Sequence, residues 1–314
     1  MSQHRSLIDD HINAWVKALP KGGLYAPMAY LMGLPAKRVR PALVLMGCEL
    51  FGGRAEAALD EALGIELFHN FTLMHDDIMD AAPLRRGQPT VHEKWDVNTA
   101  ILSGDAMLVM AYQLMARRPE VSALFGRYAL EVCEGQQLDM EFEQRDDVDA
   151  EAYRGMIRLK TAVLLACSLR VGAAIAGASA ADSERIGAFG EHIGLAFQLR
   201  DDLLDVFGDP ARTGKQQGGD LRAGKKTILL IRGLELSALN GRSELREELA
   251  KPADQRDVTR MLNALRALGI REEAERAVQE EEVKATNALD AVAVAEDRKM
   301  PLRELTAGLM TRSY

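Results

Sequence analysis

Apolar side chains recur every three or four residues along most of the chain, which is the spacing of an α-helix that faces a core. Proline and glycine interrupt this pattern at intervals. We see no convincing β-strand alternation, low-complexity tract or linker, so we expect residues 1–314 to form a single helical domain. The predicted helices cover residues 3–19, 41–53, 56–80, 97–117, 121–144, 150–178, 182–207 and much of 227–312.

Residues 161–180 form the most apolar stretch and approach the length needed to span a membrane. Arg170 lies in the middle of this stretch, and its apolar side chains are mostly small. A helix that is apolar on all sides can also form the buried centre of a large helical domain. We favour the buried helix and expect no membrane span.

Composition narrows the class of protein. The net charge of −8 argues against a general nucleic-acid binder. Cys48, Cys133 and Cys167 are widely spaced and odd in number, which is typical of buried thiols in a reducing compartment. The N-terminal residues are too polar for a secretory signal. We therefore expect a cytoplasmic protein.

An acidic cluster ends the helix predicted over residues 56–80. Asp76 and Asp80 share one helix face with Asp77 beside them, and carboxylates this close repel one another unless a cation lies between them. Mg²⁺ suits such oxygen ligands, and Arg85 and Arg86 follow in a loop with the planar geometry that binds phosphate. A solvated helix end is the ordinary alternative.

A second acidic cluster repeats this arrangement. Asp201, Asp202 and Asp205 end the helix predicted over residues 182–207, and a loop rich in glycine and lysine follows. Two such clusters suggest opposed walls of one cavity, with several Mg²⁺ ions gripping a diphosphate between them. The apolar helices behind them would form a deep pocket, which fits a diphosphate with a hydrocarbon tail.

Other polar residues have two possible roles each. Lys37, Arg38 and Arg40 gather at a predicted helix N-terminus, where an anion is favoured, although surface basic residues are usually just solvated. His69 lies two turns before Asp76 and could be a binding residue or a core histidine.

Three further features are the role of Lys160, the start of a helix at Thr90 and the role of a polar stripe. Lys160, at the edge of an apolar face, needs an anionic partner unless it extends to solvent. Thr90 is predicted to open a helix in a capping box with Glu93. A polar stripe could line a cavity or face water, and the sequence leaves both readings open; it consists of Glu134, Gln137 and Glu141.

Taken together, residues 37–227 resemble a trans-isoprenyl diphosphate synthase of the polyprenyl synthetase family. Its two aspartate-rich motifs resemble residues 76–80 and 201–205. The resemblance implies an all-α bundle around a central cavity, a homodimer and about three Mg²⁺ ions per site. It also implies roles for individual residues: Asp76, Asp80 and Asp201 as main metal ligands with Asp77 and Asp205 supporting; Arg85, Lys160, Thr161, Gln198, Lys215 and Lys225 at the allylic diphosphate or the developing cation; and Lys37, Arg40, His69 and Arg86 at isopentenyl diphosphate.

One departure concerns the isopentenyl site. The family usually has Gly-Gly before its Lys-Arg pair, and this chain has Pro35-Ala36. The turn must therefore form without the conformational freedom of glycine. The basic side chains are all present, so we keep the assignment.

The implied reaction is a head-to-tail condensation in trans geometry. The allylic diphosphate ionises, the double bond of isopentenyl diphosphate attacks the cation, and the departing diphosphate takes the proton. Phe71 and Thr72 precede Asp76 by five and four residues, and one aromatic followed by a small residue resembles enzymes that make geranylgeranyl diphosphate (C20). Farnesyl diphosphate (C15) is the close alternative.

Three other functions fit the chain less well. A terpene cyclase would not need the isopentenyl site, and a regulatory subunit of a heteromeric synthase tends to lose an aspartate motif. A metal-dependent diphosphate hydrolase would need a base that positions water, and the sequence offers no clear candidate.

Overall fold

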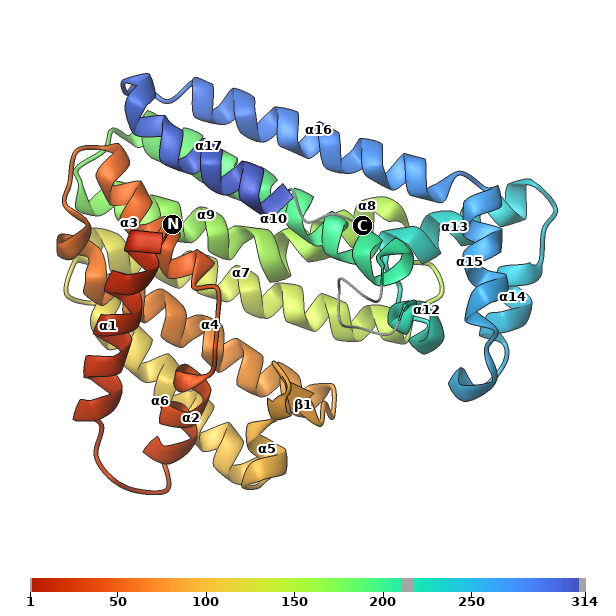
Figure 1. Ribbon diagram of the computed structural model, residues 1–314, viewed down its shortest axis with the longest axis horizontal. Helices are drawn as coiled ribbons and strands as arrows, with labels where there is room; N and C mark the ends of the chain where they lie inside the picture. Colours follow the sequence, from red (N-terminus) through yellow and green to blue (C-terminus); the bar gives the residue numbers. More distant parts are fainter. Residues whose placement is uncertain (1, 210–216, 311–314) are drawn as a thin grey trace. The chain divides into compact units, whose positions relative to one another are not determined.

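A computed structural model describes residues 2–209 and 217–310, which are helical apart from one short β-hairpin and the connecting loops (Figure 1). The predicted all-α fold is confirmed. The elements are α1 (Ser2–Ala18), α2 (Tyr25–Gly33), α3 (Val39–Leu50), η1 (Ala55–Ala58), α4 (Leu59–Met79), β1 (Leu84–Arg85), β2 (Gln88–Pro89), α5 (Val91–Lys94), α6 (Val97–Met115), α7 (Pro119–Glu143), α8 (Ala150–Ile157), η2 (Arg158–Ala162), α9 (Val163–Ile175), α10 (Ala180–Phe207), α12 (Gly219–Ala223), α13 (Ile228–Leu239), α14 (Glu244–Leu249), η3 (Ala253–Gln255), α15 (Val258–Ala267), α16 (Ile270–Asp290) and α17 (Glu296–Met310).

Some local expectations were wrong. The sequence pattern missed α2 and the hairpin, and the helix expected over residues 150–178 is interrupted by η2, a single π-helical turn. Helix α5 does begin after Thr90, but the Thr90 hydroxyl caps no helix. It donates a hydrogen bond to the carbonyl oxygen of Ala82 instead (2.8 Å). The expected capping box with Glu93 is therefore absent.

Contacts divide the chain into two compact units. Unit 1 holds the described residues up to Arg127 together with Cys167–Glu184 and Ala293–Pro301. Unit 2 holds Tyr128–Ala166, Arg185–Val292 and the described residues from Leu302 onward. The expectation of one domain over residues 1–314 stays a prediction.

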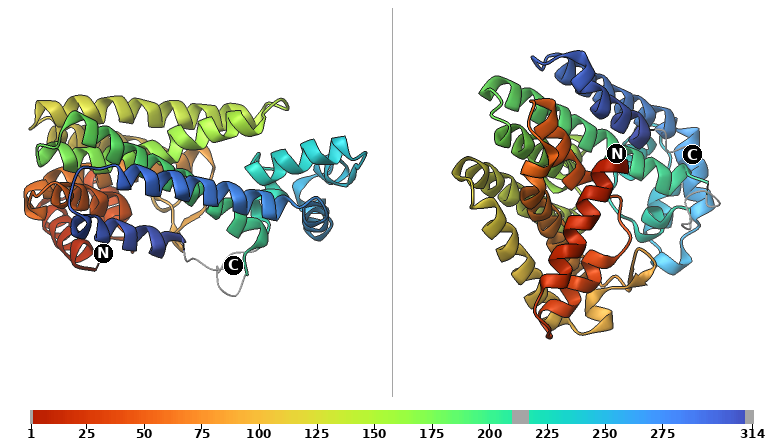
Figure 2. Two further views of the ribbon diagram at one scale, coloured as in Figure 1. Left: turned by 90° about the horizontal axis from the view of Figure 1, so that it is seen from above. Right: turned by 60° about the vertical axis from the view of Figure 1, so that its left-hand side comes forward.

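Helix α4 is the centre of unit 1. It packs along α6 and also contacts α1 and α3 (Figures 1 and 2). Asp60 and Glu61 lie in its first turn, where negative charge is favoured by the helix dipole. Most of its residues from Glu61 to Phe71 are buried. This burial places the acidic C-terminal end of α4 at a defined position.

Helix α9 is the apolar stretch whose burial the sequence favoured. Cys167, Leu169 and Val171 are almost fully buried. In unit 1 α9 lies against α3 at Gly172, where an added Cβ would come within 2.1 Å of the Val44 carbonyl oxygen. Arg170 donates a hydrogen bond to Glu184 (2.6 Å). Among the described residues, no helix combines the length and hydrophobicity that crossing a membrane requires.

The cysteines differ in their surroundings. Cys48 and Cys167 are buried, as expected, but Cys133 is exposed. The expectation of three buried thiols is wrong for Cys133, because the sequence did not tell which face of α7 is covered.

Unit 2 contains α8, the larger part of α10, and α12 to α16 around an apolar core. A buried carboxylate joins three of its helices. Glu281 of α16 pairs with Arg154 of α8, with His192 of α10 (2.7 Å) and with Lys284 of its own helix (2.8 Å). These cationic partners lower the pKa of Glu281 to about 2 against the opposing effect of burial.

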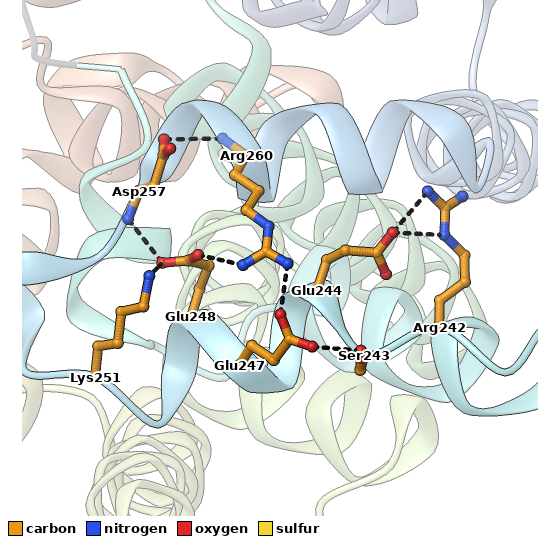
Figure 3. A network of polar contacts seen from close by, with 8 residues as sticks. All are labelled: Arg242, Ser243, Glu244, Glu247, Glu248, Lys251, Asp257 and Arg260. Carbon is orange, nitrogen blue, oxygen red and sulfur yellow. Dashed lines mark hydrogen bonds and ion pairs between the residues drawn. The ribbon is translucent and has the colours of Figure 1, made fainter.

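A second network joins α14 to α15 (Figure 3). The Glu248 carboxylate accepts hydrogen bonds from Lys251 Nζ (2.7 Å), Arg260 Nη1 (2.8 Å) and the backbone N–H of Asp257 (3.0 Å). These bonds lower the pKa of Glu248 to about 2, because each donor favours the charged carboxylate.

We expect Glu248→Gln to lower the melting temperature by roughly 2–4 °C at pH 7. The folded pKa is depressed below the ordinary value of 4.5, so the stabilisation is full above pH 4.5 and is lost as the pH falls toward 2. The difference between variant and wild type should therefore narrow between pH 4.5 and 3, as followed by circular dichroism. Glu280→Gln, at an exposed position of α16, is the matched control and should change little. A difference that does not depend on pH would contradict this role.

Candidate active site

The end of α4 and the hairpin after it are joined by an ion pair. Arg85 Nε lies 2.8 Å from both carboxylate oxygens of Asp77, and Arg85 Nη2 lies 2.7 Å from Asp77 Oδ1. The same nitrogen lies 3.5 Å from Asp76. The hairpin can turn in two residues because Arg86 and Gly87 both adopt positive φ, as a type I′ turn requires. The loop expected to present the two arginines is thus a defined β-turn.

Burial distinguishes the three aspartates of this cluster. Asp77 is 2% exposed, Asp76 is half-buried, and Asp80 is exposed at the C-cap of α4. Burial raises the pKa of Asp77, and the bonds from Arg85 oppose that rise. Asp77 therefore holds Arg85 in place, while the other two carboxylates lie nearer to solvent.

The predicted metal ligands have suitable chemistry, since carboxylate oxygen is the donor that Mg²⁺ prefers. However, within residues 2–209 and 217–310 no group of three or more His, Cys, Asp or Glu side chains is arranged to hold a metal ion. The metal-ligand roles of both clusters stay predictions, including those of Asp201 and Asp205 at the second.

Basic side chains predicted to bind isopentenyl diphosphate come together beside this cluster. Arg40 Nη1 lies 3.2 Å from His69 Nε2, and only a neutral His69 can accept that bond. Burial and the charges of Arg40 and Arg86 lower the pKa of His69 well below its ordinary value. Burial also lowers the pKa of Arg40 to about 10, with Glu66 opposing the shift and Arg86 adding to it. The charges of Arg85 and Arg38 add to this effect, so four arginines keep one histidine neutral.

Neighbouring Lys37 and Arg38 have different roles. Lys37 is exposed, but Arg38 is buried and faces inward. Arg38 donates hydrogen bonds to Glu66 (2.6 Å), to Asp9 (3.2 Å) and to the carbonyl oxygen of Met32 (2.6 Å). The sequence did not distinguish this structural arginine from Arg40.

The turn that lacks the usual glycines also involves Arg38. Its φ of 52° lies in the left-handed region, which disfavours residues other than glycine. The three hydrogen bonds of its side chain hold it there. The chain thus forms this turn after Pro35-Ala36 by securing an arginine in a conformation that glycine would adopt freely.

Phe71, the predicted limit to product length, belongs to an aromatic cluster. Its ring centroid lies 4.8 Å from that of His75 and 5.6 Å from that of Phe68, and Phe68 packs edge-on against Phe125 (5.2 Å). Phe71 is 8% exposed. Thr72 is half-buried, and its hydroxyl donates to the His69 carbonyl oxygen (2.8 Å). Phe71 is therefore held by rings on two sides.

In unit 2, the second cluster contains a chain of hydrogen bonds. Tyr153 Oη lies 2.5 Å from Asp202 Oδ2, Gln198 Nε2 lies 3.1 Å from Asp202 Oδ1, and the Thr161 hydroxyl lies 3.2 Å from Gln198 Oε1. Burial raises the pKa of Asp202 to about 7, although Tyr153 and Gln198 favour the anion. The predicted residues Thr161 and Gln198 are thus in direct contact.

The loop after α10 folds back on the same cluster. Asp205 accepts a hydrogen bond from the backbone N–H of Asp220 (2.9 Å), and its carbonyl oxygen accepts one from Gly218 N–H (2.7 Å). Asp201 is half-buried, and Lys225 is exposed yet close enough to lower the pKa of Asp202. Lys215 lies outside the described residues.

Lys160 has the anionic partner that its position required. Its Nζ lies 2.6 Å from a carboxylate oxygen of Asp139 in α7. Asp139 was not among the predicted site residues. Lys160 and Thr161 both lie in the π-helical turn η2. Such turns, although rare, are frequent at functional sites. The polar stripe on α7 did not point to Asp139, because Asp139 is two residues from both Gln137 and Glu141 and therefore lies on another face of the helix.

Glycines on two helices make room for this turn. An added Cβ at Gly135 of α7 would lie 2.2 Å from the backbone nitrogen of Lys160. One at Gly194 of α10 would lie 2.4 Å from the Cα of Ala162. The turn is therefore packed between two helix backbones, and no sequence motif signals this contact.

A pocket of about 500 Å³ lies elsewhere in unit 1, around the first turn of α4. Its charged lining residues largely pair with one another, as Arg118 does with Glu61 (2.9 Å) and His11 with Asp60 (3.0 Å). None of the residues predicted to bind substrate lines it.

Comparisons with known proteins found matches over most of the chain. A family model described as polyprenyl synthetase matches residues 21–265. The geranylgeranyl diphosphate synthase of Sulfolobus acidocaldarius is 39% identical over 267 residues, covering 79% of this chain and 80% of that protein. The geranylfarnesyl diphosphate synthase of Aeropyrum pernix is 37% identical over 266 residues, covering 81% and 82%. A crystal structure of a geranylgeranyl pyrophosphate synthase matches with a TM-score of 0.94 and 42% identity, covering 100% of this chain and 99% of that one.

We expect Gly135→Ala to destabilise the protein by about 1–3 kcal/mol, because the new methyl group must displace the backbone of η2. The free energy of unfolding in urea measures this effect. Gly126→Ala is the matched control, since it lies in the same helix with no atom within 4 Å of an added Cβ. It should stabilise by about 0.5–1 kcal/mol through helix propensity. Equal stability of the two variants would show that α7 and η2 are not in close contact.

Proposed function

Because this chain belongs to the polyprenyl synthetase family, we propose that it is a prenyltransferase that makes geranylgeranyl diphosphate (C20). It would condense isopentenyl diphosphate with allylic diphosphates, head to tail and in trans geometry. One observation in the structure carries the proposal: the group formed by Arg40, His69, Arg85 and Arg86 beside the acidic end of α4. Such a group suits diphosphate because guanidinium forks match phosphate oxygens.

The binding roles of single residues are part of this proposal. Arg85 would bind the allylic diphosphate, and Arg86 would bind isopentenyl diphosphate together with Lys37, Arg40 and His69. Neutral His69 would donate or accept a hydrogen bond without adding charge. At the second cluster, Lys160, Lys215 and Lys225 would bind the allylic diphosphate, with Thr161 and Gln198 near the reacting carbon.

We also propose that the aspartates bind Mg²⁺, with about three ions per site. Asp76, Asp80 and Asp201 would be the main ligands, and Asp77 and Asp205 would support them. When bound, Mg²⁺ would neutralise the diphosphate as it leaves. The donor oxygens fit this ion, and the exposure of Asp80 leaves its carboxylate accessible.

The proposed reaction conserves atoms and charge. The C–O bond of the allylic diphosphate breaks, and its electron pair leaves with the diphosphate. The π electrons of isopentenyl diphosphate form the new C–C bond to the allylic carbon. A proton is then lost from the adjacent carbon and passes to the departing diphosphate. The basic side chains would hold both diphosphates in register, which lowers the entropic cost of bringing two substrates together.

The proposed product length rests on Phe71, whose ring would limit the growing tail. Relatives of similar identity are named for C20 and for longer geranylfarnesyl products, so identity alone does not set the length. The aromatic cluster around Phe71 supports a short product, because a ring held on two sides would stop a growing tail. Farnesyl diphosphate is the other short product.

We propose that the enzyme works as a homodimer in the cytoplasm. Helix α6 supports an interface between two copies, because Leu102 and Val109 are 59% and 56% exposed and Tyr112 follows on the same face. A second copy would cover this apolar face and form a symmetric contact.

Incubation of the purified protein with Mg²⁺, isopentenyl diphosphate and each allylic starter tests the activity, with products identified by mass spectrometry. We expect C20, and no product without isopentenyl diphosphate. Asp76→Asn and Asp201→Asn should each lower the rate by at least about 100-fold. Asp297→Asn, at an exposed position, is the matched control. A cyclised product formed without isopentenyl diphosphate would instead identify a terpene cyclase.

We expect Phe71→Ala to lengthen the product by at least one C5 unit, because removing the ring opens space behind Asp76. Chain length by mass spectrometry is the measurement. Phe189→Ala, which removes a buried ring from unit 2, should leave the chain length unchanged. An unchanged product from Phe71→Ala would exclude Phe71 as the limit to growth.

A further inference from the structure

A buried tyrosine ends the hydrogen-bond chain that runs to Thr161. Tyr153 of α8 is 2% exposed and Asp202 of α10 is 3% exposed, and their oxygens lie 2.5 Å apart. Asp202 also accepts from Gln198 Nε2, one helical turn earlier. Gln198 Oε1 in turn faces the Thr161 hydroxyl in η2. Three elements of unit 2 are thus joined through one polar chain.

The chemistry of each group sets the direction of these bonds. Burial and the nearby Asp202 raise the pKa of Tyr153 well above its ordinary value, so its hydroxyl keeps its proton and donates it to Asp202. The Gln198 amide has one donor end and one acceptor end. Since its NH₂ group bonds to Asp202, its oxygen must face Thr161. Thr161 therefore donates its only hydroxyl proton to Gln198.

A hydroxyl whose proton is committed presents only lone pairs in its other directions. Lone pairs stabilise positive charge, whereas a freely rotating hydroxyl can turn its proton toward it. We propose that Tyr153 is a positioning residue: through Asp202 and Gln198 it holds the Thr161 oxygen so that its lone pairs face the allylic cation. This inference rests on the proposed function, which puts the reacting carbon near Thr161.

The packing of η2 limits how Tyr153 can affect Thr161. The backbone of Thr161 cannot shift freely, because Gly135 and Gly194 allow two helices to contact η2 on either side. What remains adjustable is the rotation of the hydroxyl and the orientation of the Gln198 amide. The Gln198 amide is oriented by its bond to one oxygen of Asp202, and Tyr153 holds the other oxygen of that carboxylate.

A double-mutant cycle tests the proposal. Tyr153→Phe keeps the ring and removes the hydroxyl, and we expect it to lower kcat about tenfold with KM for isopentenyl diphosphate unchanged. Thr161→Val removes the end of the chain. In that background, Tyr153→Phe should change kcat by less than about twofold, because its effect passes through Thr161.

A binding measurement separates positioning from a general loss of structure. An amine with the geranyl chain carries a positive charge like the allylic cation, and calorimetry in the presence of Mg²⁺ and inorganic diphosphate gives its affinity. Tyr153→Phe should weaken amine binding about tenfold and leave diphosphate binding unchanged. Tyr128→Phe, which removes a hydroxyl from another buried ring of unit 2, should change neither.

Three results would overturn the inference. Losses in kcat that multiply in the double variant would show that Tyr153 and Thr161 act independently. Equal weakening of amine and diphosphate would show a structural role for Tyr153. If the wild-type protein makes no prenyl product, the proposed function is overturned and this inference with it. If the wild type is active but the kcat losses multiply in the double variant, this inference alone is overturned.

Discussion

The buried ion pair between Arg38 and Glu66 is the interaction on which the proposed diphosphate site in unit 1 depends. Through Arg38, the start of α3 is bonded to α1, α2 and α4 at once. Removing one partner of such a pair leaves an uncompensated buried charge, which costs about 3–5 kcal/mol. Because α3 and α4 are fixed together here, Arg40 can contact His69, which lies three residues after Glu66. The site thus depends on an arginine that itself touches no proposed ligand.

The long helices and the clusters of charged residues could be located from the sequence, because helical periodicity and clustered aspartates are local signals. It could not rank adjacent residues by burial, so Arg38 and Arg40 looked alike although one faces inward. Helix α2 was missed because it is short and almost uniformly apolar, and the hairpin because each strand has only two residues. Tyr153 and Asp139 gave no signal of their own, because their roles arise from contacts across helices.

The surroundings of the two acidic clusters are built by different physics. In unit 1, ion pairs and burial select the charge states, so that a histidine stays neutral among arginines. In unit 2, close backbone packing around η2 leaves little freedom except in the directions of hydrogen bonds. Charge therefore sets the arrangement of side chains in unit 1, and the direction of hydrogen bonds sets it around η2 in unit 2. Substitutions that conserve charge but change shape should be tolerated better at the hairpin than at η2.

The ion pair between Arg85 and Asp77 has a consequence for how fast an anion can arrive. Arg85 is already neutralised by a carboxylate in the free protein, and the chain as a whole carries a charge of −8. Long-range attraction for a free diphosphate is therefore weak, and electrostatic steering contributes little to its association rate. A diphosphate already paired with Mg²⁺ carries less negative charge and meets less repulsion. Under the proposed function, the protein's own electrostatics would favour binding of the metal complex over binding of the bare anion.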